Sequence, residues 1–316
     1  MTVSQFCIRV LAVVYMLPAG SWAQNFPAKV VRLVVPFTAG SGSDTVGRII
    51  GGGLSAVFGQ QVIIENRGGA SGIIGTDIAA KAPPDGYTLV QINQSHAANV
   101  TLQSKLPYDA VRDFAPVTQL VTAPALVVAH PSLPVKSIAE LVKLAKARPG
   151  AINYSTAGSG TPTFIAAALF KKQAGIDMVD VPYKAGGEAL TGVLAGETSI
   201  YFSPLAVALP HVGKAGRLRA LAVTAATRVS MLPDCPTVIE AGYPGYQYGN
   251  WYGLLVPAKT PRETIVIIRN AAIAALNNPA TSKRFGDLGY VLIGDQPEEF
   301  AAHIKAEIDR LATILR

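Results

Sequence analysis

The chain has 316 residues, is 50% hydrophobic and carries a formal net charge of +7. This length suits two globular domains with separate cores, and the composition excludes a disordered protein. The basic residues are scattered rather than clustered with aromatic side chains, so nucleic acid is not an expected partner. A mild positive field would instead favour the capture of small acids.

The first 23 residues have the layout of a secretory signal peptide. Arg9 precedes a run of about eight apolar residues, and the small-residue site Ser21-Trp22-Ala23 follows. Because a membrane span needs roughly 20 apolar residues, we expect cleavage after Ala23 and export of a soluble protein rather than a membrane anchor. Cys7 would leave with the signal, so Cys235 has no disulfide partner within the chain and is expected to be packed rather than reactive.

Short runs rich in Val and Ile alternate with helical patterns from residue 30 onward. This alternation predicts an α/β fold in which mostly parallel sheets are covered by helices. The first part of the chain predicts strands near 30–35, 62–65 and 89–93, with helices near 44–58 and 73–80. The second part predicts strands near 125–129, 152–155, 178–181, 200–202 and 220–223, with a helix at 138–147. A connection rich in Pro, Gly and Tyr at 232–249 precedes a strand at 251–256 and helices near 261–277, 280–288 and 297–315.

One pentapeptide occurs twice, as Thr38-Ala39-Gly40-Ser41-Gly42 and as Thr156-Ala157-Gly158-Ser159-Gly160. Each copy follows a predicted strand and precedes a predicted helix, and Pro162 suits the first position of the second helix. Such turns present unpaired N–H groups and the positive end of a helix dipole, which suits an anion. Ligands of open α/β sheets bind beyond the carboxyl ends of strands, so the two loops would face each other across a cleft. The alternative is that the repeat reflects two well-formed turns and nothing more.

Local motifs of common enzymes are absent from the sequence. No serine has a glycine both two residues before it and two residues after it, as the nucleophile elbow of hydrolases requires. The four histidines are not spaced as metal ligands are in the common local motifs. Neither glycine loop has the lysine of a P-loop or the third glycine of a dinucleotide-binding turn. We therefore expect no cofactor, no metal and no catalytic residue. A catalytic group assembled from distant residues is the enzyme alternative.

Further segments carry a resemblance through their order and spacing: Arg32 to Gly40 with Asp44 and Arg48, Gln61 to Arg67, Asp85 to Leu89, Leu218 to Thr224, Leu232 to Thr237, and Trp251-Tyr252-Gly253. With these segments the chain resembles the Bug receptors, the extracytoplasmic solute-binding proteins of tripartite tricarboxylate transporters. The resemblance implies a monomeric periplasmic binding protein of the Venus flytrap type, with a small organic acid held between two domains. We expect domain 1 at 24–124 and 248–316, and domain 2 at 125–247.

The resemblance also implies two integral membrane transporter subunits as partners. A receptor that reports ligand to a signalling membrane protein is the alternative, followed by an enzyme of small acids. One carboxylate of the ligand is implied to bind main-chain groups of the first loop, with further contacts from residues after other strands. The expected ligand-binding residues are Phe37, Thr38, Ala39, Gly40, Ser41, Gly42, Asp44, Asn93, Ser95, His96, Ser155, Thr156, Ala157, Gly158, Ser159, Gly160, Thr161, Tyr183 and Ser203.

Several of these positions have competing interpretations. Asp44 is expected to cap its helix rather than touch a ligand, because Asp is a preferred N-cap and would repel an anion. Trp251 and Tyr252 are expected to pack in the core or the hinge. Ser203 stands where the family often has Asp, so the counter-charge for an ammonium group would be missing. We therefore expect an acid without an ammonium group.

Overall fold

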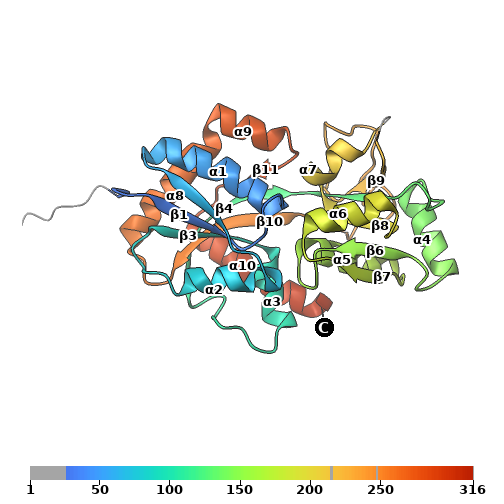
Figure 1. The fold of residues 1–316 in the computed structure, drawn as a ribbon, viewed down its shortest axis with the longest axis horizontal. Coiled ribbons are helices and arrows are strands. Elements are labelled where there is room, and N and C mark those ends of the chain that lie inside the picture. The colour runs from blue at the N-terminus through green and yellow to red at the C-terminus, as the bar shows by residue number, and fades with distance from the viewer. Residues whose placement is uncertain (1–25, 214–215, 247, 316) are drawn as a thin grey trace, which may run out of the picture.

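The computed structural model describes residues 26–213, 216–246 and 248–315. The signal peptide expected at 1–23 lies outside these residues. Two β-sheets, each flanked by helices, lie next to each other along the longest axis of the molecule (Figure 1). The fold-class prediction of a two-sheet α/β protein is therefore confirmed.

The first sheet has the spatial order β11-β4-β10-β3-β1-β2. Its strands are β1 (Val31–Val35), β2 (Val62–Asn66), β3 (Thr88–Asn93), β4 (Phe114–Ala123), β10 (Asn250–Pro257) and β11 (Val291–Leu292). One face carries α1 (Gly42–Phe58), α8 (Arg262–Asn277) and α9 (Pro279–Gly286). The other carries α2 (Ile73–Ala80), α3 (Gln94–Leu102) and α10 (Pro297–Leu315). Successive residues of β1 point to opposite faces, so Leu33 and Val35 join the core under α1 while Val34 joins the core on the other side.

The second sheet has the spatial order β7-β6-β8-β5-β9. Its strands are β5 (Ala125–Ala129), β6 (Asn153–Thr156), β7 (Val179–Pro182), β8 (Ile200–Pro204) and β9 (Arg219–Val223). Its helices are α4 (Ile138–Ala147), α5 (Pro162–Ala174), α6 (Gly186–Ala195) and the short α7 (Leu205–Ala208). Leu141 of α4 and Phe170 of α5 share a core with Val127, whereas Val193 of α6 packs with Val128 on the opposite face.

Both sheets are mixed rather than mostly parallel, which corrects one detail of the prediction. In the first sheet β10 pairs antiparallel with both β3 and β4. In the second sheet β5 pairs antiparallel with both β8 and β9. The periodicity of a buried strand is the same in either direction, so the sequence pattern did not distinguish the two pairings.

The chain passes between the sheets at two places. β4 leads into β5 with Pro124 as the intervening residue, and the segment after β9 leads back into β10. β4 and β10 pair with each other along their length, so the two crossing strands are joined. The predicted domain division at 125 and 247 corresponds to these crossings in the chain and stays a prediction. Among the described helices, each is too short or too polar to cross a lipid bilayer.

Candidate ligand-binding site

A cavity of about 270 Å³ is lined by residues from both sheets. From the first sheet come Phe37, Thr38, Gly40, Ser41, Gly42, Ser43, Gly68, Gly69, Ala70, Ser71, Gly72, Asn93 and Tyr252. From the second come Ala157, Gly158, Thr161, Pro162, Thr163, Tyr183, Lys184, Ala185, Gly186, Tyr201, Pro204 and Val207. Most of these residues follow the carboxyl ends of β1, β2, β3, β6, β7 and β8. This is the edge at which α/β sheets bind ligands.

Three α-helices of the described chain have their first residue at this cavity. The first residues of α1, α5 and α6, namely Gly42, Pro162 and Gly186, all line it. The first turn of a helix has N–H groups without intrahelical acceptors, and the helix dipole places partial positive charge there. Among the described residues that line the cavity none is acidic, and Lys184 is the one with a basic side chain. The cavity is therefore electrostatically suited to an anion.

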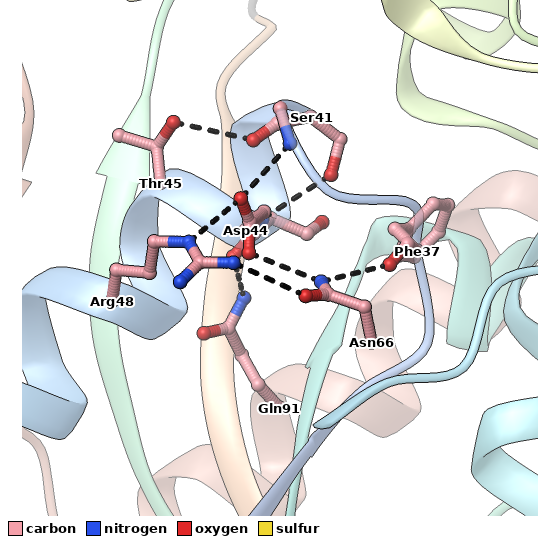
Figure 2. Close-up of polar contacts among 9 residues, drawn as sticks. Phe37, Ser41, Asp44, Thr45, Arg48, Asn66 and Gln91 are labelled. Atoms are coloured by element: carbon pink, nitrogen blue, oxygen red, sulfur yellow. Dashed lines mark hydrogen bonds and ion pairs between the residues drawn. The ribbon is translucent and has the colours of Figure 1, made fainter. Parts of the chain in front are cut away.

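The first glycine loop is held by a hydrogen-bond network behind it (Figure 2). The Ser41 hydroxyl accepts the N–H of Asp44 at 3.2 Å and so caps α1, which begins at Gly42. The Asp44 carboxylate accepts the N–H of Gly40 at 2.9 Å and the Nε–H of Arg48 at 3.0 Å. Asn66 donates to the other carboxylate oxygen at 3.1 Å. The expectation that Asp44 is the N-cap is therefore wrong, because Ser41 and Asp44 form a variant of the capping box.

Asp44 holds the loop rather than lining the cavity. Burial raises the pKa of Asp44, but hydrogen bonds from Arg48, Gly40 and Asn66 together lower it below its usual value. The carboxylate is therefore ionised at neutral pH, and its charge is engaged by these donors. Asn66 also donates to the carbonyl of Phe37 at 3.1 Å, which fixes the start of the same loop.

The second glycine loop is held mainly by threonine hydroxyls. The Thr156 hydroxyl accepts the N–H of Gly158 at 3.2 Å and donates to Asp180 at 2.8 Å. Thr163 accepts the N–H of Ala157 at 3.0 Å, and Thr161 donates to the carbonyl of Gly158 at 2.6 Å. Thr161 is the N-cap of α5 without a side-chain capping bond.

The end of β3 contributes one residue to the cavity and two to a small pocket that adjoins it. The Asn93 side chain caps α3 by accepting the N–H of Ser95 and donates to the Ser43 hydroxyl at 3.0 Å. Ser95 and His96 are buried and line a cavity of about 10 Å³ that shares Phe37, Ser71, Gly72 and Asn93 with the larger one. The ring Nε2 of His96 lies 2.8 Å from the carbonyl oxygen of Ala110, and burial lowers the His96 pKa to about 4. His96 is therefore neutral at pH 7 and does not offer a charge to an anion.

The structure brings part of the expected residue set together. The cavity is lined by Phe37, Thr38, Gly40, Ser41, Gly42, Asn93, Ala157, Gly158, Thr161 and Tyr183. It is not lined by Ala39, Asp44, Ser95, His96, Ser155, Thr156, Ser159, Gly160 or Ser203. Ser155, Thr156 and Ser203 lie beneath the loops, fully shielded from solvent. The Ser203 hydroxyl donates to the carbonyl of Pro204, so position 203 supports the strand end instead of facing the cavity.

Sequence reasoning missed the loop after β2 and two tyrosines of the cavity wall, Tyr201 and Tyr252. Gly68-Gly69-Ala70-Ser71-Gly72 has a glycine pattern like the two predicted loops, which could have identified it. Tyr252 was expected to pack in the core or hinge, and it is buried, but it also lines the cavity. A Cβ atom on Gly42 would lie 2.9 Å from the Tyr252 hydroxyl oxygen, so glycine is needed for this approach. Burial raises the pKa of Tyr252 and of Tyr201, which keeps both hydroxyls protonated.

Comparisons with known proteins give consistent results. The model of the tripartite tricarboxylate transporter family receptor, TctC, matches residues 46–316. Protein BugT of Bordetella pertussis is 31% identical to this chain, over 93% of the chain and 90% of BugT. An R. palustris protein solved with adipate has a TM-score of 0.87 and 34% identity, covering 92% of this chain and 97% of that one. MatC from Rhodopseudomonas palustris, solved with bound malate, has a TM-score of 0.85 and 32% identity, covering 92% and 100% respectively.

Proposed function

Because this chain belongs to the receptor family of tripartite tricarboxylate transporters, we propose that it captures a small carboxylate between its two sheets and delivers it to such a transporter. The observation that carries the proposal is the convergence of the starts of α1, α5 and α6 on a cavity with no acidic residue in its described lining. Main-chain N–H groups hydrogen-bonded to a charged oxygen contribute about 1.5–3 kcal/mol each, so a few of them would support micromolar binding.

The cavity wall favours a short dicarboxylate. Its volume of about 270 Å³ is that of a small-metabolite site, and Tyr201, Tyr252 and Val207 offer apolar surface beside the helix starts. Lys184 is exposed at the rim on the loop between β7 and α6, where it would face a second carboxylate. The related proteins solved with adipate and malate bind acids of this class. We propose that this chain binds a dicarboxylate or related acid.

An amino acid is a less suitable ligand. None of the described residues that line the cavity is acidic, so an ammonium group would find no carboxylate partner there. Ser203, at the position where the family often has Asp, is shielded from solvent, and its hydroxyl donates to the carbonyl of Pro204. We therefore propose that the ligand has no ammonium group.

We further propose that the receptor is an exported monomer that works with two integral membrane subunits. Neighbouring genes for two such subunits would support transport, whereas a neighbouring sensor kinase would support signalling. Incubation of the purified protein with its bound acid distinguishes a transport or signalling receptor from an enzyme, because a receptor leaves the acid chemically unchanged.

Native mass spectrometry of the purified protein, followed by calorimetry with malate, adipate, citrate, glutamate and aspartate, tests the ligand class. We expect a co-purified acid or saturable binding of at least one acid without an ammonium group. Tight binding of glutamate or aspartate, with no simple acid bound, would contradict the proposal.

A pair of glycine substitutions in α1 assigns the binding to this cavity. Gly42→Ala places a methyl group against the Tyr252 hydroxyl and within 3.5 Å of Pro204. The methyl group forces the Tyr252 hydroxyl to move in the cavity wall, so we expect a loss of about 1 kcal/mol of binding free energy, which is about a fivefold fall in ligand affinity. Gly52→Ala is the control, because its methyl group meets no atom within 4 Å and lies on the exposed side of the same helix. Equal affinities for the two variants would place the ligand elsewhere.

A further inference from the structure

The two halves of the cavity are joined by a direct hydrogen bond at its edge. The Ser71 hydroxyl, in the loop after β2, donates to the carbonyl oxygen of Ser159, in the loop after β6. Beside this bond, Gly160 lies against Asn99 and Leu102 of α3 so closely that a Cβ there would be 3.3 Å from the Asn99 side-chain oxygen and 3.1 Å from Leu102. The two loops therefore touch through a polar contact and a close backbone approach.

The Ser159 carbonyl is free to accept this bond because of where α5 begins. In the first loop the equivalent carbonyl, that of Ser41, accepts the N–H of Thr45 at 3.0 Å as the first bond of α1. In the second loop α5 begins at Pro162, and its first bond runs from Ile165 to the carbonyl of Thr161. The Ser159 carbonyl thus lies outside the helix, and no N–H group of α5 donates a hydrogen bond to it.

Ser71 makes this bond from an unfavourable backbone conformation. Its φ is 53° and that of the preceding Ala70 is 47°, in the left-handed region that residues other than glycine rarely adopt. Within the first half, Asn99 donates to the Ser71 carbonyl at 3.1 Å and Gly72 donates to the Gly69 carbonyl at 3.0 Å. From the other half, the bond to Ser159 is the hydrogen bond that holds the Ser71 side chain, among the residues that the structure describes. Strained residues of this kind persist where surrounding contacts hold them, and they are concentrated at ligand-binding sites.

We propose that the Ser71–Ser159 hydrogen bond, the cleft latch, holds the two halves of the binding site together and positions the 68–72 loop on the cavity. The latch forms when the halves meet and is lost when they separate. It therefore stabilises the closed form and slows ligand release. Ser71 is a positioning residue in this role, and the part of the inference that concerns ligand release rests on the proposed function.

Ser71→Ala tests the cleft latch because it removes the hydroxyl alone. We expect the dissociation rate of malate or adipate, followed by stopped-flow fluorescence of Trp251, to rise about two- to twelvefold, the range for loss of one neutral hydrogen bond. The association rate should change less, since the bond forms after encounter. Ser104→Ala is the control, because Ser104 is exposed just beyond α3 and should leave both rates unchanged.

Ser71→Gly keeps the test valid if the alanine variant folds poorly. Glycine adopts the left-handed conformation without strain, so this variant loses the hydroxyl while the loop geometry is retained. Its dissociation rate should also rise about two- to twelvefold. Release from both Ser71 variants at the wild-type rate would overturn the cleft latch.

Hydrogen exchange of the ligand-free protein separates failure of the latch from failure of the proposed ligand class. A hydrogen bond between the loops slows the opening of both, so amides in 70–72 and 158–161 should exchange at least about twofold faster in Ser71→Ala than in wild type. If wild type binds neither malate nor adipate, those ligands are wrong and the exchange rates alone decide the latch. Unchanged exchange in both Ser71 variants would then overturn it.

Discussion

The two copies of Thr-Ala-Gly-Ser-Gly have the same sequence but different structures. In the first copy Ser41 caps α1 and Gly42 is already helical, whereas in the second copy Ser159 is exposed and Gly160 has a φ of 76°. The second helix begins two positions later relative to the repeat, at Pro162 instead of the residue equivalent to Gly42. The pentapeptide therefore determines a turn after a strand but not where the helix starts.

The residues after each copy account for this difference. The Ser41 hydroxyl accepts the main-chain N–H of Asp44, and the residue at the equivalent place in the second copy is Pro162, which has no N–H. Ser159 therefore has no matching donor to cap, and the cap passes to Thr161. A single proline thus shifts the helix start and leaves the second loop longer.

The largest expected difference between the loops concerns the acidic residue that supports each one. Asp44→Asn removes a buried charge that accepts bonds from Gly40, Arg48 and Asn66, so we expect a loss of about 1–3 kcal/mol in the free energy of unfolding. Asp180→Asn is the matched variant for the second loop, because Asp180 of β7 is half-buried and accepts one bond from Thr156 of that loop. Its loss should be smaller in urea denaturation, and equal losses would mean that the two loops are supported alike.

A smaller effect is expected from the two equivalent serines. Ser41→Ala removes a capping bond, which costs about 1 kcal/mol of unfolding free energy. Ser159→Ala removes a hydroxyl that is exposed and caps no helix, so the change should stay within about 0.5 kcal/mol. Thermal and urea denaturation of the two variants would measure the difference. A Ser159→Ala loss as large as that of Ser41→Ala would show that the second hydroxyl also caps.

The smallest expected effect is a difference in how Asp44 and Asp180 make the free energy of unfolding depend on pH. The pKa of Asp44 is lowered from 3.8 despite its burial, so its contribution to stability is present above pH 3.8 and is lost as pH falls through the folded-state pKa. Burial raises the pKa of Asp180 above 3.8, so its contribution is present below pH 3.8 and is lost as pH rises through the folded-state pKa.

We compare the free energy of unfolding of each Asn variant with that of wild type from about pH 2.5 to about pH 6, a window around the ordinary Asp pKa. The difference should change with pH in opposite directions for the two variants, because the two pKa values are shifted in opposite directions. His96 and His303 titrate in both backgrounds, so their contributions cancel in the comparison. If the two differences change with pH in the same direction, the pKa shift given for Asp44 or for Asp180 has the wrong sign.

Strands and helices with an uninterrupted apolar pattern could be predicted from the sequence. β5, α2, α4 and α10 have the predicted bounds. In β5 and α4 the buried positions are all Val, Ile, Leu or Ala, so their periodicity is plain in the sequence. β4 was missed, since its buried interior includes Thr118 and Gln119 and it contains Pro116. α3 was missed for a similar reason, because its first turn has the buried polar residues Gln94, Ser95 and His96.

The candidate site was predictable where its chemistry is local. The two glycine loops could be found because a turn after a strand depends on neighbouring residues. Asn93 at the end of β3 was named from the family resemblance alone. The contribution of Tyr252 could not be found, because β10 reaches the cavity by pairing with β3 from more than 150 residues away (Tyr252 lies opposite Asn93). Ala70 and Ser71 have no sequence signal for a left-handed backbone, so the shape of their loop depends on tertiary contacts.

The order in which the strands occur along the chain has a consequence for folding. The second sheet is built from one continuous stretch, β5 to β9, whereas the first sheet needs β10 and β11 from beyond that stretch. Closing the first sheet therefore brings together segments separated by the whole second sheet, and such non-local pairing is slow to form. We expect the second sheet to gain protection first during refolding, and the cavity to be completed in the last step.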